Sequence, residues 1–167
     1  AGPDALVALK TRLVADTGWD YYPRDPLARS IHHFLADRFL NPGSCLVGAE
    51  HLRHFAGAPL VMVANHLSYA DANLVDLLLE RGGGGEVANR LTAMAGPKIF
   101  TSRERRFSSL CFGTIKVPQS AEVSSGEAVL SAREVARAAR HAIDVARDRL
   151  AAGDALLLFG EGTRSRS

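Results

Sequence analysis

The chain has 167 residues, of which 47% are hydrophobic and 23% charged, and its formal net charge at pH 7 is +2. These values are ordinary for a globular domain with a core of its own. The net charge is too small for a protein dedicated to binding nucleic acid. No apolar run approaches the roughly 20 residues that cross a bilayer, so we expect any membrane contact by this segment to be peripheral.

The cysteines and two of the histidines point to no metal or redox site. Cys45 and Cys111 are far apart in the sequence and match no metal-binding or redox spacing. We therefore expect two buried, reduced thiols in a cytoplasmic protein. His51 and His54 have a spacing that could suit a metal, but no cluster of further ligands accompanies them. We expect no bound metal.

Residues 1–43 are expected to form a helical segment packed on the rest of the protein. Apolar residues at helical spacing predict one helix over 4–16 and a second over 27–39. Between them lies Trp19-Asp20-Tyr21-Tyr22-Pro23, whose aromatic rings could settle at a membrane interface. We favour packing against the core instead, because neither helix has a strongly basic face.

Short apolar runs alternate with helical patterns over residues 44–167. The pattern predicts strands over 60–64, 91–95, 114–117 and 155–159, and helices over 72–81, 104–112 and 127–152. Gly82 to Gly85 are interpreted as a flexible loop and not a phosphate cradle, because no Lys-Ser/Thr pair follows them. This alternation is typical of an α/β fold, with a mainly parallel sheet in an αβα layered arrangement.

The last predicted helix, 127–152, follows a polar loop expected over 118–126. Its predicted buried stripe consists of Val135, Ala139, Ala142, Ile143, Ala146 and Leu150. Its arginines are most simply a solvated face.

The first candidate site is Asn65-His66-Leu67-Ser68-Tyr69-Ala70-Asp71, directly after the apolar run 60–64. His66 would lie in the turn at the carboxyl end of a strand, where ligands and catalytic groups gather in open α/β sheets. An imidazole can take a proton from an alcohol, and a carboxylate on its other nitrogen sets the tautomer. We interpret His66 and Asp71 as a general base with its orienting group. Ser68 and Asp71 could also be an ordinary helix-capping pair.

A second motif, Gly160-Glu161-Gly162-Thr163-Arg164-Ser165, follows the last predicted strand. It is again a Gly-rich turn after a buried strand, here with an acid and an arginine. The two motifs, in this order, resemble the glycerolipid acyltransferase family, which comprises the glycerol-3-phosphate and 1-acylglycerol-3-phosphate acyltransferases. His66 and Asp71 have the HX4D spacing of that family. The stretch Gly96-Pro97-Lys98-Ile99-Phe100-Thr101 is similar to its second conserved segment.

The resemblance implies a reaction of phospholipid biosynthesis. A fatty acyl group would move from a thioester, on coenzyme A or an acyl-carrier protein, to a hydroxyl of glycerol 3-phosphate or 1-acylglycerol 3-phosphate. His66 would be the base and Asp71 would orient it, in a direct transfer without a cofactor. A Ser68 acyl-enzyme is disfavoured because the chain has no Gly-x-Ser-x-Gly elbow. The protein would be cytoplasmic or peripheral on the inner face of a membrane.

The phosphate of the acceptor, glycerol 3-phosphate or 1-acylglycerol 3-phosphate, requires cationic hydrogen-bond donors. The planar guanidinium of arginine suits it best. Arg164 and Arg166 reproduce the spacing of two arginines in plastid-type soluble glycerol-3-phosphate acyltransferases. The basic group of the second segment could be Lys98 or one of Arg103, Arg105 and Arg106. The substrate-binding candidates that the resemblance implies are Lys98, Lys116, Glu161, Gly162, Thr163, Arg164 and Arg166.

The chain departs from the family pattern in two respects. Gly160 stands where the family normally has proline. The chain also stops at Ser167, whereas the family normally continues with further strands, so the resemblance, over about residues 45–167, implies a core that is incomplete at its C-terminus. Two alternatives remain open. One is an acyltransferase of the same family that uses another lysophospholipid or dihydroxyacetone phosphate, and the other is a catalytically silent module that binds phosphorylated lipid.

Overall fold

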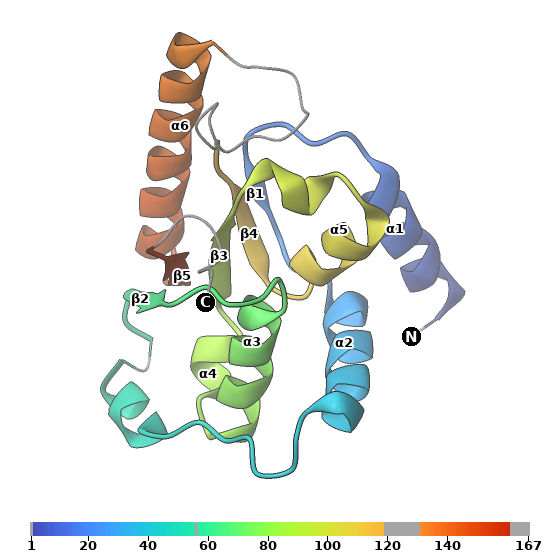
Figure 1. Cartoon of the computed structure of the whole chain (residues 1–167), viewed down its shortest axis with the longest axis vertical. Helices are drawn as coiled ribbons and strands as arrows, with labels where there is room; N and C mark the ends of the chain where they lie inside the picture. Colours follow the sequence, from blue (N-terminus) through green and yellow to red (C-terminus); the bar gives the residue numbers. More distant parts are fainter. Residues whose placement is uncertain (1, 56, 119–130, 161–167) are drawn as a thin grey trace.

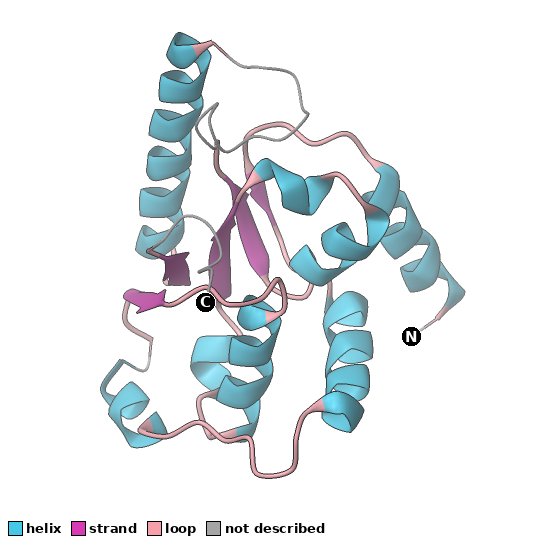
Figure 2. Cartoon of the chain, viewed as in Figure 1, coloured by secondary structure: helices cyan, strands magenta, loops and turns pink. Residues whose placement is uncertain are grey.

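Within residues 2–55, 57–118 and 131–160, which the computed structural model describes, five short strands form one sheet (Figures 1 and 2). The strands are β1 (Tyr21–Tyr22), β2 (Leu60–Ala64), β3 (Leu91–Ala95), β4 (Gly113–Lys116) and β5 (Ala155–Phe159). Their order across the sheet is β1-β4-β3-β5-β2. All neighbours are parallel except β1, which runs antiparallel to β4. The expected mainly parallel α/β fold is confirmed.

Helices cover both faces of this sheet. They are α1 (Pro3–Val14), α2 (Pro26–Phe39), α3 (Asp71–Arg81), α4 (Gly85–Ala88), α5 (Arg103–Ser109) and α6 (Ala132–Ala151), with 3₁₀ segments η1 (Ala49–Phe55) and η2 (Pro97–Phe100). Leu156 packs with Ala142 and Ala146 of α6 on one face. Its neighbour Leu157 faces the opposite cluster, which includes Leu9 of α1. The central strands β4, β3 and β5 are therefore mostly buried on both sides, as expected for parallel strands in a layered fold, whereas Val61 and Val63 on one face of β2 are exposed.

The N-terminal segment packs on the core and also contributes a strand. Tyr21 and Tyr22 of β1 pair with Ile115 and Thr114 of β4. Leu9 of α1 and Ala28 of α2 belong to one buried cluster together with residues of the sheet. The structure thus supports packing of the aromatic stretch. It also adds an edge strand that was not predicted, because a two-residue strand has no periodicity to recognise.

Several predicted elements differ in detail from the structure; the helix predicted over 104–112, for example, ends at Ser109. The expected loop Gly82–Gly85 is shorter, because Gly85 opens the four-residue helix α4. The long helix α6 begins at Ala132 and not at 127; residues 127–130, like 119–126 of the predicted loop, lie outside the described residues. Its start is set by a capping box, in which the Ser131 hydroxyl accepts from the Glu134 N–H and the Glu134 carboxylate accepts from the Ser131 N–H. The Ser-x-x-Glu spacing was readable in the sequence.

The buried face of α6 is an alanine stripe. Ala138, Ala142 and Ala146 are buried, whereas Ile143 is 64% exposed. The prediction that Ile143 is buried was wrong: small residues four apart let the helix lie close to the sheet, and this contact turns Ile143 toward solvent. None of the helices in the described ranges has the length and apolar character needed to span a membrane.

The two cysteines differ in exposure, so the expectation that both are buried was wrong. Cys111 is buried and Cys45 is exposed. Burial raises the pKa of the Cys111 thiol to about 12, and the nearby charge of Asp76 acts in the same direction.

Since the thiolate is the reactive form of cysteine, we expect a chromogenic disulfide reagent at pH 8 to label one thiol per folded chain and two per unfolded chain. Cys45→Ser should remove the labelling of the folded chain. Rapid labelling of the folded Cys45→Ser variant would contradict the buried position of Cys111.

Candidate active site

The two sequence motifs leave the sheet side by side because β2 and β5 are neighbours. Ala64, the last residue of β2, is in register with Phe159, the last residue of β5. The loop 65–70 and the segment that starts at Gly160 therefore begin at the same carboxyl edge. This is the edge at which open α/β sheets bind ligands.

His66 and Asp71 contact each other directly. His66 Nδ1 lies 2.9 Å from Asp71 Oδ2, and their side chains are only 19% and 17% exposed. The same oxygen accepts hydrogen bonds from the backbone N–H groups of Leu67, at 2.7 Å, and Ser68, at 2.8 Å. Ser68 Oγ accepts from the Ala70 N–H at 3.2 Å. The loop between the strand and α3 thus closes around one carboxylate oxygen.

The charge of Asp71 is stabilised by these contacts. Partial burial on its own raises the pKa of Asp71, but the hydrogen bonds from the Ser68 N–H, His66 and the Leu67 N–H outweigh it, so the pKa lies below its usual value. Asp71 is also the first residue of α3, where the helix dipole favours a negative charge. An ionised carboxylate only accepts hydrogen bonds, so Nδ1 of His66 carries a proton and the lone pair of the neutral ring is on Nε2. This is the tautomer that a general base requires.

Phe159 lies against the face of the His66 ring. The two ring centroids are 4.4 Å apart and the ring planes differ by 26°. Phe159 was not among the predicted site residues. Its position as the last residue of a strand, immediately before the second motif, was a signal that could have drawn attention to it.

The first turn of α3 is anchored to α5 by a second unpredicted contact. Asn73 is 1% exposed; its Nδ2 donates to Ser108 O at 3.1 Å, and Ser108 Oγ donates to Asn73 Oδ1 at 2.5 Å. Because Asn73 is two residues after Asp71, this contact also sets where Asp71 begins the helix. The sequence signal for this contact was an asparagine side chain between apolar residues of a predicted helix.

The three arginines of α5 have different environments. Arg106 is buried and donates hydrogen bonds to Leu13 O and Ala15 O, which join α5 to the end of α1. Arg103 is exposed. Arg105 donates to Lys98 O at 3.3 Å, and its guanidinium carbon lies 4.9 Å from the centre of the Tyr69 ring. Since Tyr69 belongs to the loop between His66 and Asp71, Arg105 is the α5 arginine that contacts the candidate site.

The two lysines predicted to bind substrate also follow carboxyl ends of strands. Lys98 lies in η2, directly after β3, and Lys116 ends β4. Lys116 Nζ lies 3.4 Å from both Thr17 O and Thr17 Oγ1, and over the rings of Trp19 and Phe100. Because β4 is two strands from β5, Lys116 is roughly 10 Å across the edge from the end of β5.

The remaining predicted site residues, Glu161, Gly162, Thr163, Arg164 and Arg166, lie outside the described residues. In the part of the chain that the structure describes, no group of three or more His, Cys, Asp or Glu side chains could hold a metal ion.

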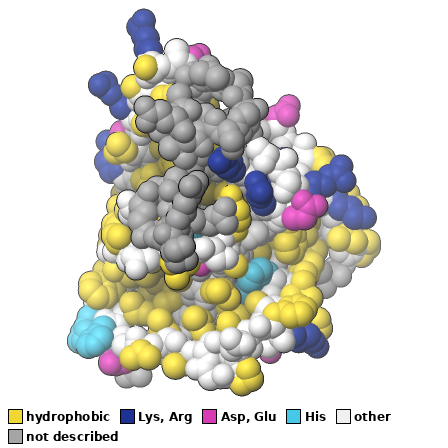
Figure 3. Space-filling view, in the orientation of Figure 1, with side chains coloured by type: hydrophobic (Ala, Val, Ile, Leu, Met, Phe, Trp, Pro, Cys, Tyr) yellow, Lys and Arg dark blue, Asp and Glu magenta, His cyan; other side chains and the backbone are white. Residues whose placement is uncertain are grey.

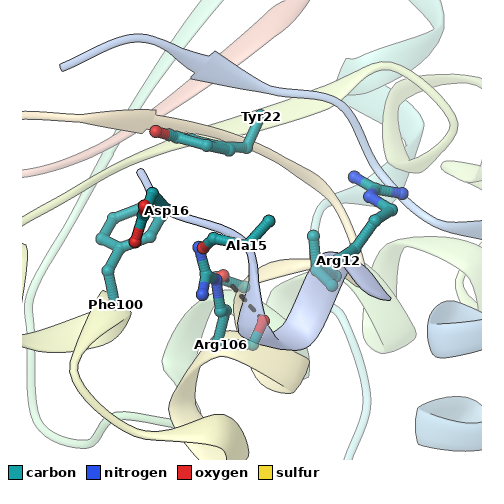
Figure 4. Close-up of a pocket in the computed structure, with 8 residues that line it drawn as sticks. Arg12, Ala15, Asp16, Tyr22, Phe100 and Arg106 are labelled. Atoms are coloured by element: carbon teal, nitrogen blue, oxygen red, sulfur yellow. Dashed lines mark hydrogen bonds between the residues drawn. The ribbon is translucent and has the colours of Figure 1, made fainter. Parts of the chain in front are cut away.

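A small pocket lies elsewhere, at the junction of α1, β1 and α5 (Figure 4). Figure 4 shows Arg106 reaching toward Ala15, with Tyr22 and Phe100 on the other side of the pocket. Its volume is about 90 Å³, well below the roughly 300 Å³ at which ligand pockets begin. None of its lining residues belongs to the loop that carries His66. We assign it to packing of the N-terminal segment.

Asp71→Asn should lower the stability of the protein at neutral pH, and the difference from wild type should disappear in acid. The folded-state pKa of Asp71 is below the unfolded value of about 3.9, so its ionised form stabilises the native state above about pH 4, and this contribution is lost as pH falls through the lower folded value. We expect a lower Tm than wild type at pH 7 by circular dichroism, and a difference that shrinks below about pH 4. Asp144→Asn, which removes an exposed pair with Arg147, is the control. An equal Tm difference at all pH values would contradict the assignment.

Comparison with known proteins assigns most of the chain to one family. Residues 43–167 match the model of the Acyltransferase family, and a comparison with curated proteins finds no match. The matched range includes the strands β2 to β5, the His66–Asp71 pair and the whole second motif. The chain therefore belongs to the Acyltransferase family.

Proposed function

We propose that this acyltransferase moves a fatty acyl group from a thioester to a hydroxyl of glycerol 3-phosphate or 1-acylglycerol 3-phosphate in phospholipid biosynthesis. The observation that carries the proposal is the contact of His66 Nδ1 with Asp71 Oδ2, an oxygen that also accepts two backbone N–H groups. It leaves Nε2 as the basic nitrogen. The donor is an acyl-coenzyme A or an acyl-carrier protein, and the transfer uses no further cofactor.

The proposed reaction is a direct transfer. Nε2 of His66 takes the proton of the acceptor hydroxyl while the oxygen of that hydroxyl attacks the thioester carbonyl carbon. The C–O bond forms, the C–S bond breaks, and the departing thiolate receives the proton from the imidazolium. Asp71 holds the ring in the correct tautomer and offsets its positive charge during the step. The products are an ester and a thiol.

We propose that cations along the carboxyl edge bind the acceptor's phosphate. Arg105 is supported by its contact with Tyr69 in the His66 loop, whereas Arg106 is committed to the carbonyls of Leu13 and Ala15. Lys98 and Lys116 follow the neighbouring strands β3 and β4. Arg164, with Arg166, remains the candidate from the second motif. Glu161, Gly162 and Thr163 would shape the acceptor site beside them.

We also propose that the reaction takes place on the cytoplasmic side, at or near a membrane surface. Leu67, directly after His66, is 69% exposed, and Val63, near the end of β2, is 70% exposed. Figure 3 shows hydrophobic side chains gathered over the lower part of the molecule, where Figure 1 places β2, α3 and α2. An exposed apolar patch beside a site suits substrates that carry acyl chains.

His66→Ala should lower acyl transfer by about 10²- to 10⁴-fold without unfolding the protein, because it removes the general base. The assay follows coenzyme A release from palmitoyl-coenzyme A by chromatography, with glycerol 3-phosphate in solution or 1-acylglycerol 3-phosphate in anionic vesicles. His51→Ala, which changes a side chain that is 78% exposed, should retain full activity. A His66→Ala variant with wild-type turnover would overturn the mechanism, and vesicle binding without any transfer would favour the silent lipid-binding module.

Arg105→Gln should raise the KM for the acceptor about tenfold and change kcat little, because it removes one cationic contact with phosphate in both ground and transition states. Arg164→Ala should have the same effect. Arg103→Gln, on the exposed side of the same helix, provides the matched control in steady-state kinetics. Equal KM values for wild type and Arg105→Gln would exclude Arg105 from the acceptor site.

A further inference from the structure

We propose that Phe159 is a positioning residue that sets the plane of the His66 ring and thereby aims Nε2 at the acceptor. The inference rests on the proposed function, since it concerns the geometry of the base. It starts from the stacked contact, with centroids 4.4 Å apart and planes 26° from parallel. Neither the HX4D spacing nor the family match assigns a role to this residue.

The contact of Nδ1 with Asp71 Oδ2 fixes one corner of the His66 ring. The plane of the ring about that contact depends on what packs against the ring face, where Phe159 lies. A flat partner on the ring face opposes tilting, because tilting would lose contact with it on one side and clash on the other. Phe159 therefore restricts the tilt of the ring, and with it the direction of Nε2, in addition to the contact with Asp71.

Phe159 is well placed for this role because its own position is rigid. It ends β5, a strand that pairs with β2 on one side and with β3 on the other. Its side chain packs against the buried cluster that contains Leu91 and Leu157. The sheet thus supplies a fixed surface under a histidine that is itself carried by a loop.

The contact also links the two motifs of the site. Phe159 directly precedes Gly160, where the segment proposed to bind the acceptor begins. The strand that supplies the acceptor segment is therefore the strand that orients the base. When His66 takes up a proton, its positive charge faces the electron-rich ring of Phe159, and this attraction favours the same orientation during the reaction.

A purely structural role for Phe159, as one more side chain of the core, makes different predictions. In that case a substitution of Phe159 would lower the stability of the protein without lowering kcat selectively at an unchanged KM. A substitution of any other half-buried phenylalanine of that cluster would have the same effect. Phe107 of α5 packs against the same cluster and has no part in the proposed site. Phe107→Leu is therefore the matched control for Phe159→Leu.

The test combines kinetics with a readout that needs no substrate. We expect Phe159→Leu to lower kcat about tenfold, as expected for a misdirected catalytic group, with the acceptor KM within about twofold of wild type. Phe159→Tyr, which keeps the ring, should restore most of kcat. In proton NMR, a ring proton of His66, assigned with His66→Ala, should lose its ring-current shift in Phe159→Leu and keep it in Phe107→Leu. Thermal unfolding checks each variant, and Phe159→Met takes the place of Phe159→Leu if the latter does not fold.

The outcomes separate this inference from the proposed function. If wild type transfers acyl groups and Phe159→Leu keeps its kcat, or loses no more than Phe107→Leu, the positioning role is wrong and the proposed function stands. An unchanged chemical shift of the His66 ring proton in Phe159→Leu would also overturn the stacked geometry. If wild type transfers nothing from either donor class to either acceptor, the proposed function fails, and the positioning role fails with it even if NMR shows the stack.

Discussion

A single carboxylate oxygen organises the candidate active site. Asp71 Oδ2 is shared by His66 Nδ1 and by the N–H groups of the next two residues, Leu67 and Ser68. Because three successive residues converge on one acceptor, the turn from β2 into α3 is determined by that charge. The positive end of α3 stabilises the same charge. The negative group that orients the proposed base therefore also folds the loop that carries it.

This arrangement depends on the position of α3, which two other helices hold. Asp76, fully buried in α3, receives a two-pronged ion pair from Arg29 of α2 and a contact of 2.7 Å from His33. Asn73 joins α3 to α5 through Ser108. A buried carboxylate is tolerated only when a partner compensates its lost hydration, so the N-terminal helix α2 is part of the support of the site. The segment 1–43 thus has a structural link to the chemistry at the sheet edge.

Much of the fold could be predicted from local patterns, and the exceptions have physical reasons. The strands at 60–64, 91–95 and 155–159 match the prediction because each is a short apolar run that ends at a turn. The strand at 21–22 exists only through its pairing with β4, which no local pattern records. Ile143 follows helical spacing but faces solvent, because the alanine stripe beside it makes the closer contact with the sheet. For Arg103, Arg105 and Arg106 the sequence offered three equal candidates, and only packing distinguished them.

The sequence by itself determined the chemical groups and their order: a histidine and an aspartate five residues apart after one strand, and a Gly-rich segment with arginines after another. Such spacing lets His66 and Asp71 meet within one turn, so their contact needed no distant partner. The tertiary structure decided which strands are neighbours, and so brought Phe159 of β5 onto the face of His66. It also placed Arg105 against Tyr69 and committed Arg106 to the carbonyls of α1 and its following turn. These contacts join residues far apart in the chain, and they follow from strand pairing and core packing, which a local sequence pattern does not encode.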